Sequence, residues 1–113
     1  MRKSDKKIDN QVRVALTEVC DIALKDFFGF QWLTHTVNYN KFPQSLKIVC
    51  VFDTNENLLS FNETNNCLQL EFLIQSKLVE IGINLKTVNK HISYDSEENC
   101  HSSHNGNWAA RLG

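Results

Sequence analysis

Residues 45–53, Ser-Leu-Lys-Ile-Val-Cys-Val-Phe-Asp, form the stretch around which the rest of the chain is arranged. Positions 48–52 are apolar without interruption, so both faces of this segment avoid water. That pattern is typical of an interior strand covered on its two sides. A polar loop at residues 40–44, which contains the single proline, precedes it. The stretch therefore predicts a central strand that needs a neighbour on each edge.

The segment before the loop, residues 32–39, alternates between apolar and polar side chains, as a half-buried strand does. One face carries Leu33, His35, Val37 and Tyr39, and the other carries Trp32, Thr34, Thr36 and Asn38. The loop at 40–44 is short, so we expect the two strands to pair antiparallel. His35 shares its face with apolar residues, which predicts a partly buried imidazole with a hydrogen-bond partner.

A long helix is expected still further upstream. Apolar residues recur with helical spacing and define one stripe: Ile8, Val12, Ala15, Leu16, Val19, Ala23 and Phe27. Ser4 or Asp5 is placed to cap its start, and Gly29 is placed to end it. The stripe is wide enough to cover one face of a sheet.

Downstream of the central strand, Asp53 and Glu56 have the spacing of a capping box that opens a short helical turn. A polar break at residues 62–66 separates this turn from a second long helix over 66–81, which Gly82 ends. A third strand is expected at 87–95. The remaining tail, residues 96–113, is polar and holds Trp108 and Leu112 as isolated apolar anchors.

These elements predict one α+β domain over residues 1–113, with 1–4 and 96–113 as terminal arms. The order is αββαβ, with the second helix broken. The connection from the second to the third strand passes through a helix, so these strands are parallel and the crossover right-handed. The expected architecture has two layers: a three-stranded mixed sheet with the helices on one face. Its core should comprise Val12, Leu16, Val19, Ala23, Ile48, Cys50, Phe52, Leu70, Ile74, Leu78 and Ile92.

Composition bounds the class of protein. The chain has 113 residues, 42% of them hydrophobic and 22% charged, which suits a single packed globular domain. No apolar run approaches the roughly 20 residues of a membrane span, and no apolar segment follows the basic first residues as in a secretory signal. We therefore expect no membrane contact and a cytoplasmic location. The four cysteines form no C-x-x-C pair, so free thiols are expected.

The charge is nearly balanced but unevenly distributed. A formal net charge of −1 removes the simplest argument for a nucleic-acid binder. The first 13 residues are nevertheless basic, whereas residues 48–76 carry acids and no Lys or Arg. A basic helix start can attract phosphate. The candidate nucleic-acid contacts are Arg2, Lys3, Lys6, Lys7 and Arg13; the alternative is an ordinary solvated terminus.

The order and length of the elements over residues 5–95 resemble ribosome-binding factor A and other type II KH-like domains. The resemblance rests on the first helix, the hairpin ending in Lys47–Phe52, the broken helix pair and the strand at 91–95. It implies binding to RNA or to the small ribosomal subunit. A KH domain clamps RNA with a G-x-x-G turn between two helices. The glycines here cannot form that turn, and the break at 62–66 holds none.

A second resemblance covers nearly the whole chain. The segments RKSDKKIDN, ALTEVC, GFQWLTH, SLKIVCVFDT, YDSEENC and GNWAARL are similar to short bacterial proteins of uncharacterised function, some labelled Fis-type regulators. A Fis-type regulator is all-helical and ends in a helix-turn-helix, whereas this pattern contains strands and a polar tail. The resemblance implies a bacterial cytoplasmic protein and no particular activity.

Residues that could carry chemistry are few. Cys100, His101 and His104 are the candidate metal ligands, because thiolates and imidazoles bind zinc or iron. Structural sites usually supply four ligands in recognisable pairs, and no second pair is present, so a histidine-containing polar tail is the alternative. No phosphate-binding loop or nucleophile–base motif occurs. We therefore expect neither a cofactor nor an enzymatic activity.

Two functions remain. The first is a non-catalytic accessory protein that binds RNA or the ribosome through its basic start. The second is a protein-interaction or self-association module. A sheet covered on one face leaves Trp32, Thr34 and Thr36 on the other, with Val49 and Val51 beside them. A homodimer would cover such a face.

Overall fold

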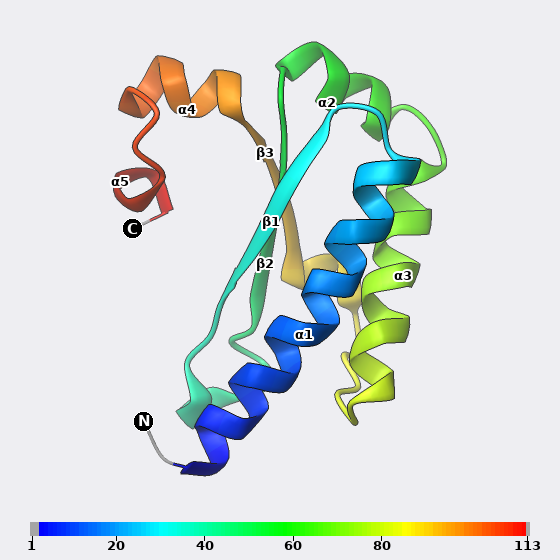
Figure 1. The fold of residues 1–113 in the computed structure, drawn as a ribbon, viewed down its shortest axis with the longest axis vertical. Helices are drawn as coiled ribbons and strands as arrows, with labels where there is room; N and C mark the ends of the chain where they lie inside the picture. The colour runs from blue at the N-terminus through cyan, green and yellow to red at the C-terminus, as the bar shows by residue number, and fades with distance from the viewer. Residues whose placement is uncertain (1–2, 113) are drawn as a thin grey trace.

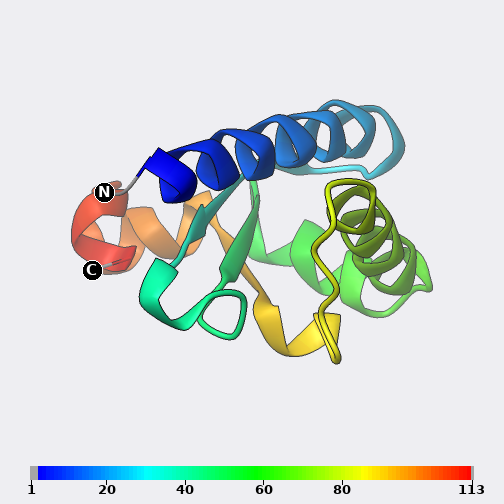
Figure 2. The same cartoon turned by 90° about the horizontal axis from the view of Figure 1, so that it is seen from below.

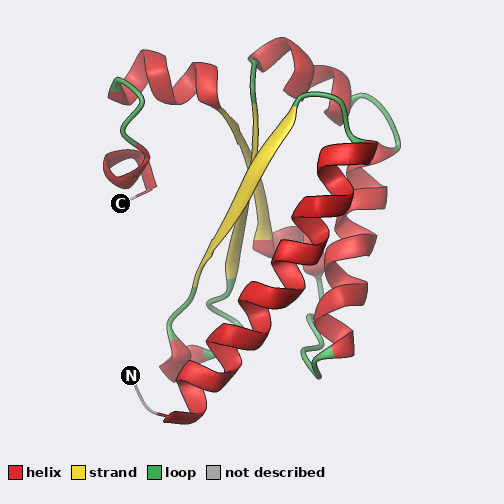
Figure 3. Ribbon diagram, viewed as in Figure 1, coloured by secondary structure: helices red, strands yellow, loops and turns green. Residues whose placement is uncertain are grey.

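The computed structural model describes residues 3–112. Its centre is a three-stranded sheet of β1 (Phe30–Thr36), β2 (Lys47–Phe52) and β3 (Ile92–Ser96), in the spatial order β1-β2-β3. β1 is antiparallel to β2, and β3 is parallel to it. The long helices α1 (Lys3–Asp26) and α3 (Asn66–Glu80) cover one face of the sheet (Figures 1 and 3). The predicted α+β class, element order and mixed sheet are confirmed.

β2 is buried at every position from Ile48 to Phe52 because it has a strand on each edge and side chains packed on both faces. The register places Leu33, Cys50 and Tyr94 in one row across the sheet, and Trp32, Val51 and Asp95 in the next. Alternate rows point to opposite faces. The Cys50 row faces α1 and α3, while the Val51 row faces away from them.

The apolar stripes of the two long helices form the core with the inner face of the sheet. α1 buries Val12, Ala15, Leu16, Val19 and Ala23, and α3 buries Leu70, Ile74 and Leu78. Every residue predicted for the core is buried. The two helices are also joined at their surface by Lys77, whose ammonium lies 3.1 Å from the Glu18 carboxylate.

The helix α2 (Asn55–Asn62) begins one residue later than the capping box predicts. Its N-cap is Thr54, whose hydroxyl accepts from the backbone N–H of Asn57 at 3.1 Å. Asp53 is still tied to the sheet, because its N–H donates to the carbonyl of Gly29. Gly29 has a φ of +86°, and a Cβ there would lie 2.8 Å from that of Asn57. Only glycine fits this crossing of the α1–β1 turn over α2.

β1 ends earlier and β3 begins later than predicted, because the residues beyond these points have no partner on β2. The parallel register begins with Ile48 opposite Ile92, so the residues before Ile92 have no β2 partner. They form the 3₁₀ turn η2 (Val88–His91) instead of extending the strand. β1 likewise ends at Thr36, opposite Lys47, and a second 3₁₀ turn, η1 (Tyr39–Lys41), follows.

The C-terminal segment predicted as a polar arm folds into α4 (Glu97–His104) and α5 (Trp108–Leu112). Ser96 caps α4 by accepting from the N–H of Asn99, and Asn105 ends it in the left-handed conformation. Both helices lie on the face of the sheet opposite α3 (Figure 2). Neither has an apolar stripe, which is why periodicity did not reveal them. No helix within residues 3–112 combines the length and apolarity required to cross a bilayer.

Candidate nucleic-acid interface

The topology gathers lysines at one end of the molecule, the lower end in Figure 1. α1 starts there, β1 and α3 finish there, and the parallel strands β2 and β3 both start from that side. We call the lysines of these termini and connections the basic end: Lys3, Lys6, Lys7, Lys41, Lys47, Lys86 and Lys90. They come from five separate parts of the chain.

Within residues 3–112, none of the basic-end lysines forms an ion pair. The neighbouring cations differ in this respect, because Arg13 pairs with Asp9 and Lys77 pairs with Glu18 and Glu80. Lys3, Lys6, Lys7, Lys41, Lys47, Lys86 and Lys90 are all exposed. Their ammonium groups are therefore available to an external anion.

Two adjoining hollows form what we call the lysine groove. One, of about 490 Å³, is lined by Lys47 and Lys90, and the other, of about 420 Å³, by Lys86. Gln44 and His91 line both. The groove offers three ammonium groups and neutral hydrogen-bonding groups side by side, an arrangement suited to phosphate oxygens.

His91 holds a fixed orientation in this groove. Its Nδ1 lies 2.7 Å from the carbonyl oxygen of Leu46, which can only accept, so Nδ1 donates. That bond links η2 to the residue before β2 and directs the other ring nitrogen, Nε2, away from the backbone. No hydrogen bond from Nε2 to another described residue is present.

A separate hollow of about 520 Å³ lies along the start of α1, lined by Lys3, Lys6 and Lys7. Val14 and Ile81 also line it and are its apolar residues. The first turn of a helix carries partial positive charge from its unpaired N–H groups, and these lysines add to it. The structure thus brings the three predicted lysines together; Arg2 lies outside the described residues.

Arg13 does not line this hollow. It lies two turns beyond Lys6 on α1, its side chain is exposed, and its Nε donates to Asp9 Oδ2 at 3.2 Å. Asp9 Oδ1 accepts from the Tyr39 hydroxyl at 2.5 Å and from His35 Nε2 at 3.2 Å. The Tyr39 hydrogen bond, more than the bonds from His35 and Arg13, lowers the pKa of Asp9, although burial opposes the shift. The resulting carboxylate forms an exposed ion pair with Arg13. Contact of Arg13 with nucleic acid stays a prediction.

The same network confirms that His35 is a partly buried imidazole with a partner. It also has a structural consequence for the basic end. Tyr39 belongs to η1 and Asp9 to the second turn of α1, so their hydrogen bond ties these segments together. Lys41, in the same 3₁₀ turn, is thereby held beside the start of α1.

Acidic residues collect at the opposite end, where β2 and β3 finish and α2 and α4 begin (Figure 1). They are Asp26, Asp53, Glu56, Glu63, Asp95, Glu97 and Glu98. Two of these acids serve helix starts: Asp53 Oδ1 accepts from the N–H of Thr54, and Glu98 Oε1 accepts from that of Asn55. Most of the acids of residues 48–76 and 95–98 thus lie far from the basic end, while Asp5, Asp9 and Glu80 remain close to it.

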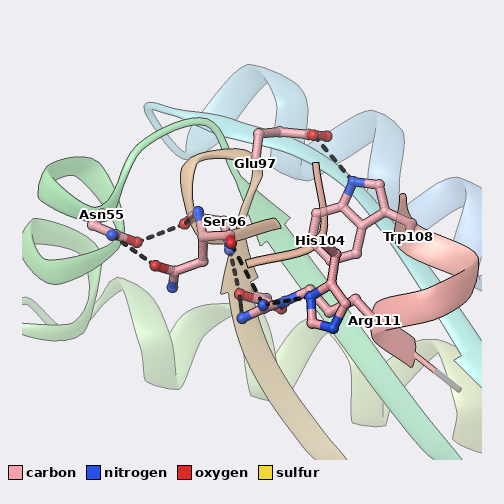
Figure 4. Close-up of polar contacts among 8 residues, drawn as sticks. Asn55, Ser96, Glu97, His104, Trp108 and Arg111 are labelled. Carbon is pink, nitrogen blue, oxygen red and sulfur yellow. Dashed lines mark hydrogen bonds and ion pairs between the residues drawn. The ribbon is translucent and has the colours of Figure 1, made fainter. Parts of the chain in front are cut away.

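The sheet face predicted to be open at Trp32 is covered. Trp32 lies edge to face against Trp108 of α5, with ring centroids 4.9 Å apart. Trp32 Nε1 donates to Glu97 Oε1 at 2.6 Å. Trp108 Nε1 donates to Glu97 Oε2 at 3.1 Å, as Figure 4 shows. Thr34 is half-buried and Thr36 is exposed. The expectation of an open sheet face at Trp32 is therefore wrong, because the last two helices cover it there. Contact of Thr34 and Thr36 with a partner stays a prediction.

Arg111 completes this cover by binding Asp95 on β3. Its Nε and Nη2 donate to the two carboxylate oxygens at 2.5 and 3.0 Å, and its Nη1 lies 3.3 Å from His104 Nδ1 (Figure 4). Guanidinium only donates, so His104 accepts. Ser96, between Asp95 and Glu97, donates to Asn55 Oδ1 at 2.5 Å and so joins α2 to the same cluster.

The structure does not bring the candidate metal ligands together. Cys100 is buried, His101 is exposed, and His104 faces the Arg111 guanidinium. A neighbouring cation opposes metal binding at His104. Among the described residues no three His, Cys, Asp or Glu side chains are placed to hold a metal ion. Cys100 is the one buried residue of α4, although its neighbours in the sequence are polar.

The thiols also lack the features of a nucleophile. All four cysteines are free. Burial raises the pKa of Cys50 to about 12, and it also raises the pKa of Cys20, Cys67 and Cys100. Reactive cysteines have a lowered pKa instead.

Sequence reasoning missed Lys41, Lys47, Lys86 and Lys90 as a group. Each lies in a connection or at a strand start, and only the strand directions bring them to one end. The predicted parallel pairing of the second and third strands was the signal that could have found them.

Comparison of the chain with models of known protein families, with curated proteins and with solved structures finds no match. The assignment of a function therefore depends on the charge and geometry of residues 3–112. The basic end combines a concentration of charge, its lysines without ion pairs, with a concave shape, the lysine groove.

Proposed function

We propose that the chain is a non-catalytic RNA-binding protein that holds the phosphate backbone in the lysine groove and along the first turns of α1. The observation that carries this proposal is the gathering of ion-pair-free lysines from separate segments at one end of the fold. Lysines that served only solubility could be spread over the whole surface, so their location at one end favours a binding role.

The chemistry favours a polyanion over a single small anion. The lysines of the groove and those of α1 line different hollows, so one phosphate cannot reach both. A phosphate backbone presents a charge at every nucleotide and can contact several ammonium groups at once. Each contact releases condensed counterions, which drives binding without any need for base recognition. A protein of net charge −1 can use this effect because seven of its acids lie at the other end, whereas the basic-end lysines form no ion pairs among the described residues.

The order of the elements favours RNA within this class of ligand. A helix, an antiparallel strand pair, a helix pair and a parallel third strand form the layout on which the resemblance to ribosome-binding factor A and type II KH-like domains rests. The contact surface we propose is a different one. The turn between α2 and α3 carries Glu63, contains no G-x-x-G, and belongs to the acidic end.

A titration of fluorescently labelled single-stranded RNA, and of purified small ribosomal subunits, tests this proposal at about 100 mM salt. The variant to compare is Lys47→Gln/Lys90→Gln, which removes two charges of the groove. The matched control is Lys25→Gln, in the last turn of α1 and thus at the other end of the fold. We expect the double variant to bind roughly tenfold more weakly and the control to bind like the parent. No binding by the parent, or equal binding by all three proteins, would contradict the proposal.

A further inference from the structure

His91 is held by the backbone where the two hollows of the lysine groove adjoin. It lines both hollows and is half-buried. Its Nδ1 lies 2.7 Å from the carbonyl oxygen of Leu46. Leu46 is itself 2% exposed, and its N–H donates to the carbonyl oxygen of Pro43 at 3.1 Å. The imidazole is therefore already oriented and loses little conformational freedom when a ligand binds.

The bond to Leu46 decides what the other ring nitrogen of His91 can do. A carbonyl oxygen only accepts, so in the neutral ring Nδ1 carries the proton and Nε2 is an acceptor. No hydrogen bond to Nε2 comes from another residue within 3–112. Phosphate oxygens cannot supply one, because they accept as well. Neutral His91 is therefore satisfied only by a ligand group that donates.

The neighbours of His91 in the groove have the complementary chemistry. Lys47 and Lys90 line the first hollow beside it, and Lys86 lines the second. Ammonium groups only donate, so they bind phosphate oxygens. Among the described residues, no carboxylate lines either hollow. The groove thus fits a ligand that carries an anionic group and a hydrogen-bond donor next to each other.

We propose that Nε2 of His91 accepts a hydrogen bond from a ribose 2′-hydroxyl while Lys47 and Lys90 hold the adjoining phosphate, so that the lysine groove distinguishes RNA from DNA. In RNA the 2′-hydroxyl stands on the carbon next to the one that carries the 3′-phosphate. DNA offers the same phosphate without the hydroxyl and leaves Nε2 unpaired. The inference rests on the proposed RNA-binding function and assigns its selectivity to one atom.

The ribose hydroxyl suits this position better than the amino group of a base. The distance between a base amino group and the phosphate depends on which base is present and on its rotation about the glycosidic bond. The distance between the hydroxyl and its phosphate is nearly the same in every nucleotide. A groove whose other contacts are with the backbone, and not with base edges, is therefore matched by the hydroxyl.

Fluorescence anisotropy of the full chain with three labelled oligomers tests the proposal: oligouridine, its 2′-fluoro analogue and oligodeoxyuridine. Fluorine preserves the sugar conformation of RNA but cannot donate a hydrogen bond. At about pH 8, where histidine side chains are ordinarily neutral, we expect the parent to bind oligouridine about three- to tenfold more tightly than either analogue. His91→Phe should bind all three with the parent's affinity for the 2′-fluoro oligomer. His101→Phe, the same change at an exposed position of α4, should keep the parent's preference.

Gln44→Leu separates His91 from the other residue that lines both hollows, and it should keep the preference for RNA. Circular dichroism checks that the variants are folded, and the comparison of the three oligomers with the parent requires no variant. Equal affinity of the parent for the three oligomers overturns the proposal. A preference retained by folded His91→Phe, or lost in Gln44→Leu, overturns the assignment to His91.

The same titrations distinguish this inference from the proposed function. Salt-sensitive binding that is equal for RNA and DNA would overturn the selectivity and leave the phosphate contacts of the basic end standing. No binding of oligouridine by the parent would overturn both.

Discussion

Trp32 in β1 and Trp108 in α5 lie edge to face, 4.9 Å apart between ring centroids, and both indole N–H groups donate to the carboxylate of Glu97. This contact joins the last helix to the first strand. It shields the outer face of the sheet at Val51, which is fully buried. The C-terminal helices are therefore part of the packed fold.

Removal of this cover should destabilise the whole domain. We expect Trp108→Ala to lower the free energy of unfolding by about 1–3 kcal/mol. The substitution would expose Trp32 to water and would remove one of the two indole donors to the Glu97 carboxylate. Leu112→Ala, in the same helix but exposed, should change stability by less than about 0.5 kcal/mol. Urea unfolding followed by circular dichroism measures both. Equal stabilities would mean that α5 does not contribute to the fold.

Acid should weaken the link between Asp95 and Arg111. Burial raises the pKa of Asp95, but the Arg111 hydrogen bonds and the backbone N–H of Ser96 outweigh it, so the pKa lies below its ordinary value of 3.8. A carboxyl group with a lowered folded pKa stabilises the fold above its unfolded pKa. That contribution is lost as the pH falls through the folded pKa.

Asp95→Asn should therefore be less stable than the parent at neutral pH, and its stability should fall less steeply below about pH 4. Asp9, whose pKa is also lowered, remains in the variant, so the acid dependence is reduced and not abolished. Urea midpoints measured from neutral pH down to about pH 2 show the difference. Parallel curves for the two proteins would rule out the Asp95–Arg111 bond as a source of acid sensitivity.

The core should respond to cavities as a tightly packed interior does. Ile74→Ala on α3 and Leu16→Ala on α1 should each cost about 2–5 kcal/mol, because both side chains are buried against the sheet. Leu24→Ala provides the control on α1, since Leu24 is largely exposed. Thermal or urea unfolding measures all three variants. If Leu16→Ala and Leu24→Ala unfold alike, the buried face of α1 has been assigned incorrectly.

Thiol labelling tests the burial of the cysteines. Cys50 and Cys100 are fully buried, whereas Cys20 and Cys67 are partly exposed. We expect a thiol reagent to label Cys20 and Cys67 in the folded protein, and to reach Cys50 and Cys100 only after denaturant is added. Mass spectrometry of the labelled peptides identifies each site. Rapid labelling of Cys100 without denaturant would show that α4 does not pack as described.

The sequence pattern predicts the fold best where burial is continuous or periodic. The apolar run of β2 and the helical stripes of α1 and α3 identify the interior, because only buried elements need such patterns. Periodicity does not predict α4 and α5, because these helices have no apolar stripe. Polar contacts such as the Arg111–Asp95 hydrogen bond attach them to the sheet instead. Sequence spacing could not show that residues so far apart would meet.

The candidate site was predictable only in part. Lys3, Lys6 and Lys7 are neighbours in the sequence and remain neighbours in space. Lys47 and Lys90 come together only through the parallel pairing of β2 with β3. Arg13 differs from these lysines in its ion pair with Asp9, which the sequence spacing of four residues could have indicated.

The salt dependence of RNA binding tests the central claim most directly. For single-stranded RNA, the logarithm of the binding constant falls with the logarithm of salt concentration by about 0.7 for each phosphate contact. We expect a steep slope for the parent, a slope shallower by about 1.4 for Lys47→Gln/Lys90→Gln, and the parental slope for Lys25→Gln. Binding that is insensitive to salt, or a slope that the double substitution leaves unchanged, would show that the basic end is not the RNA-binding surface.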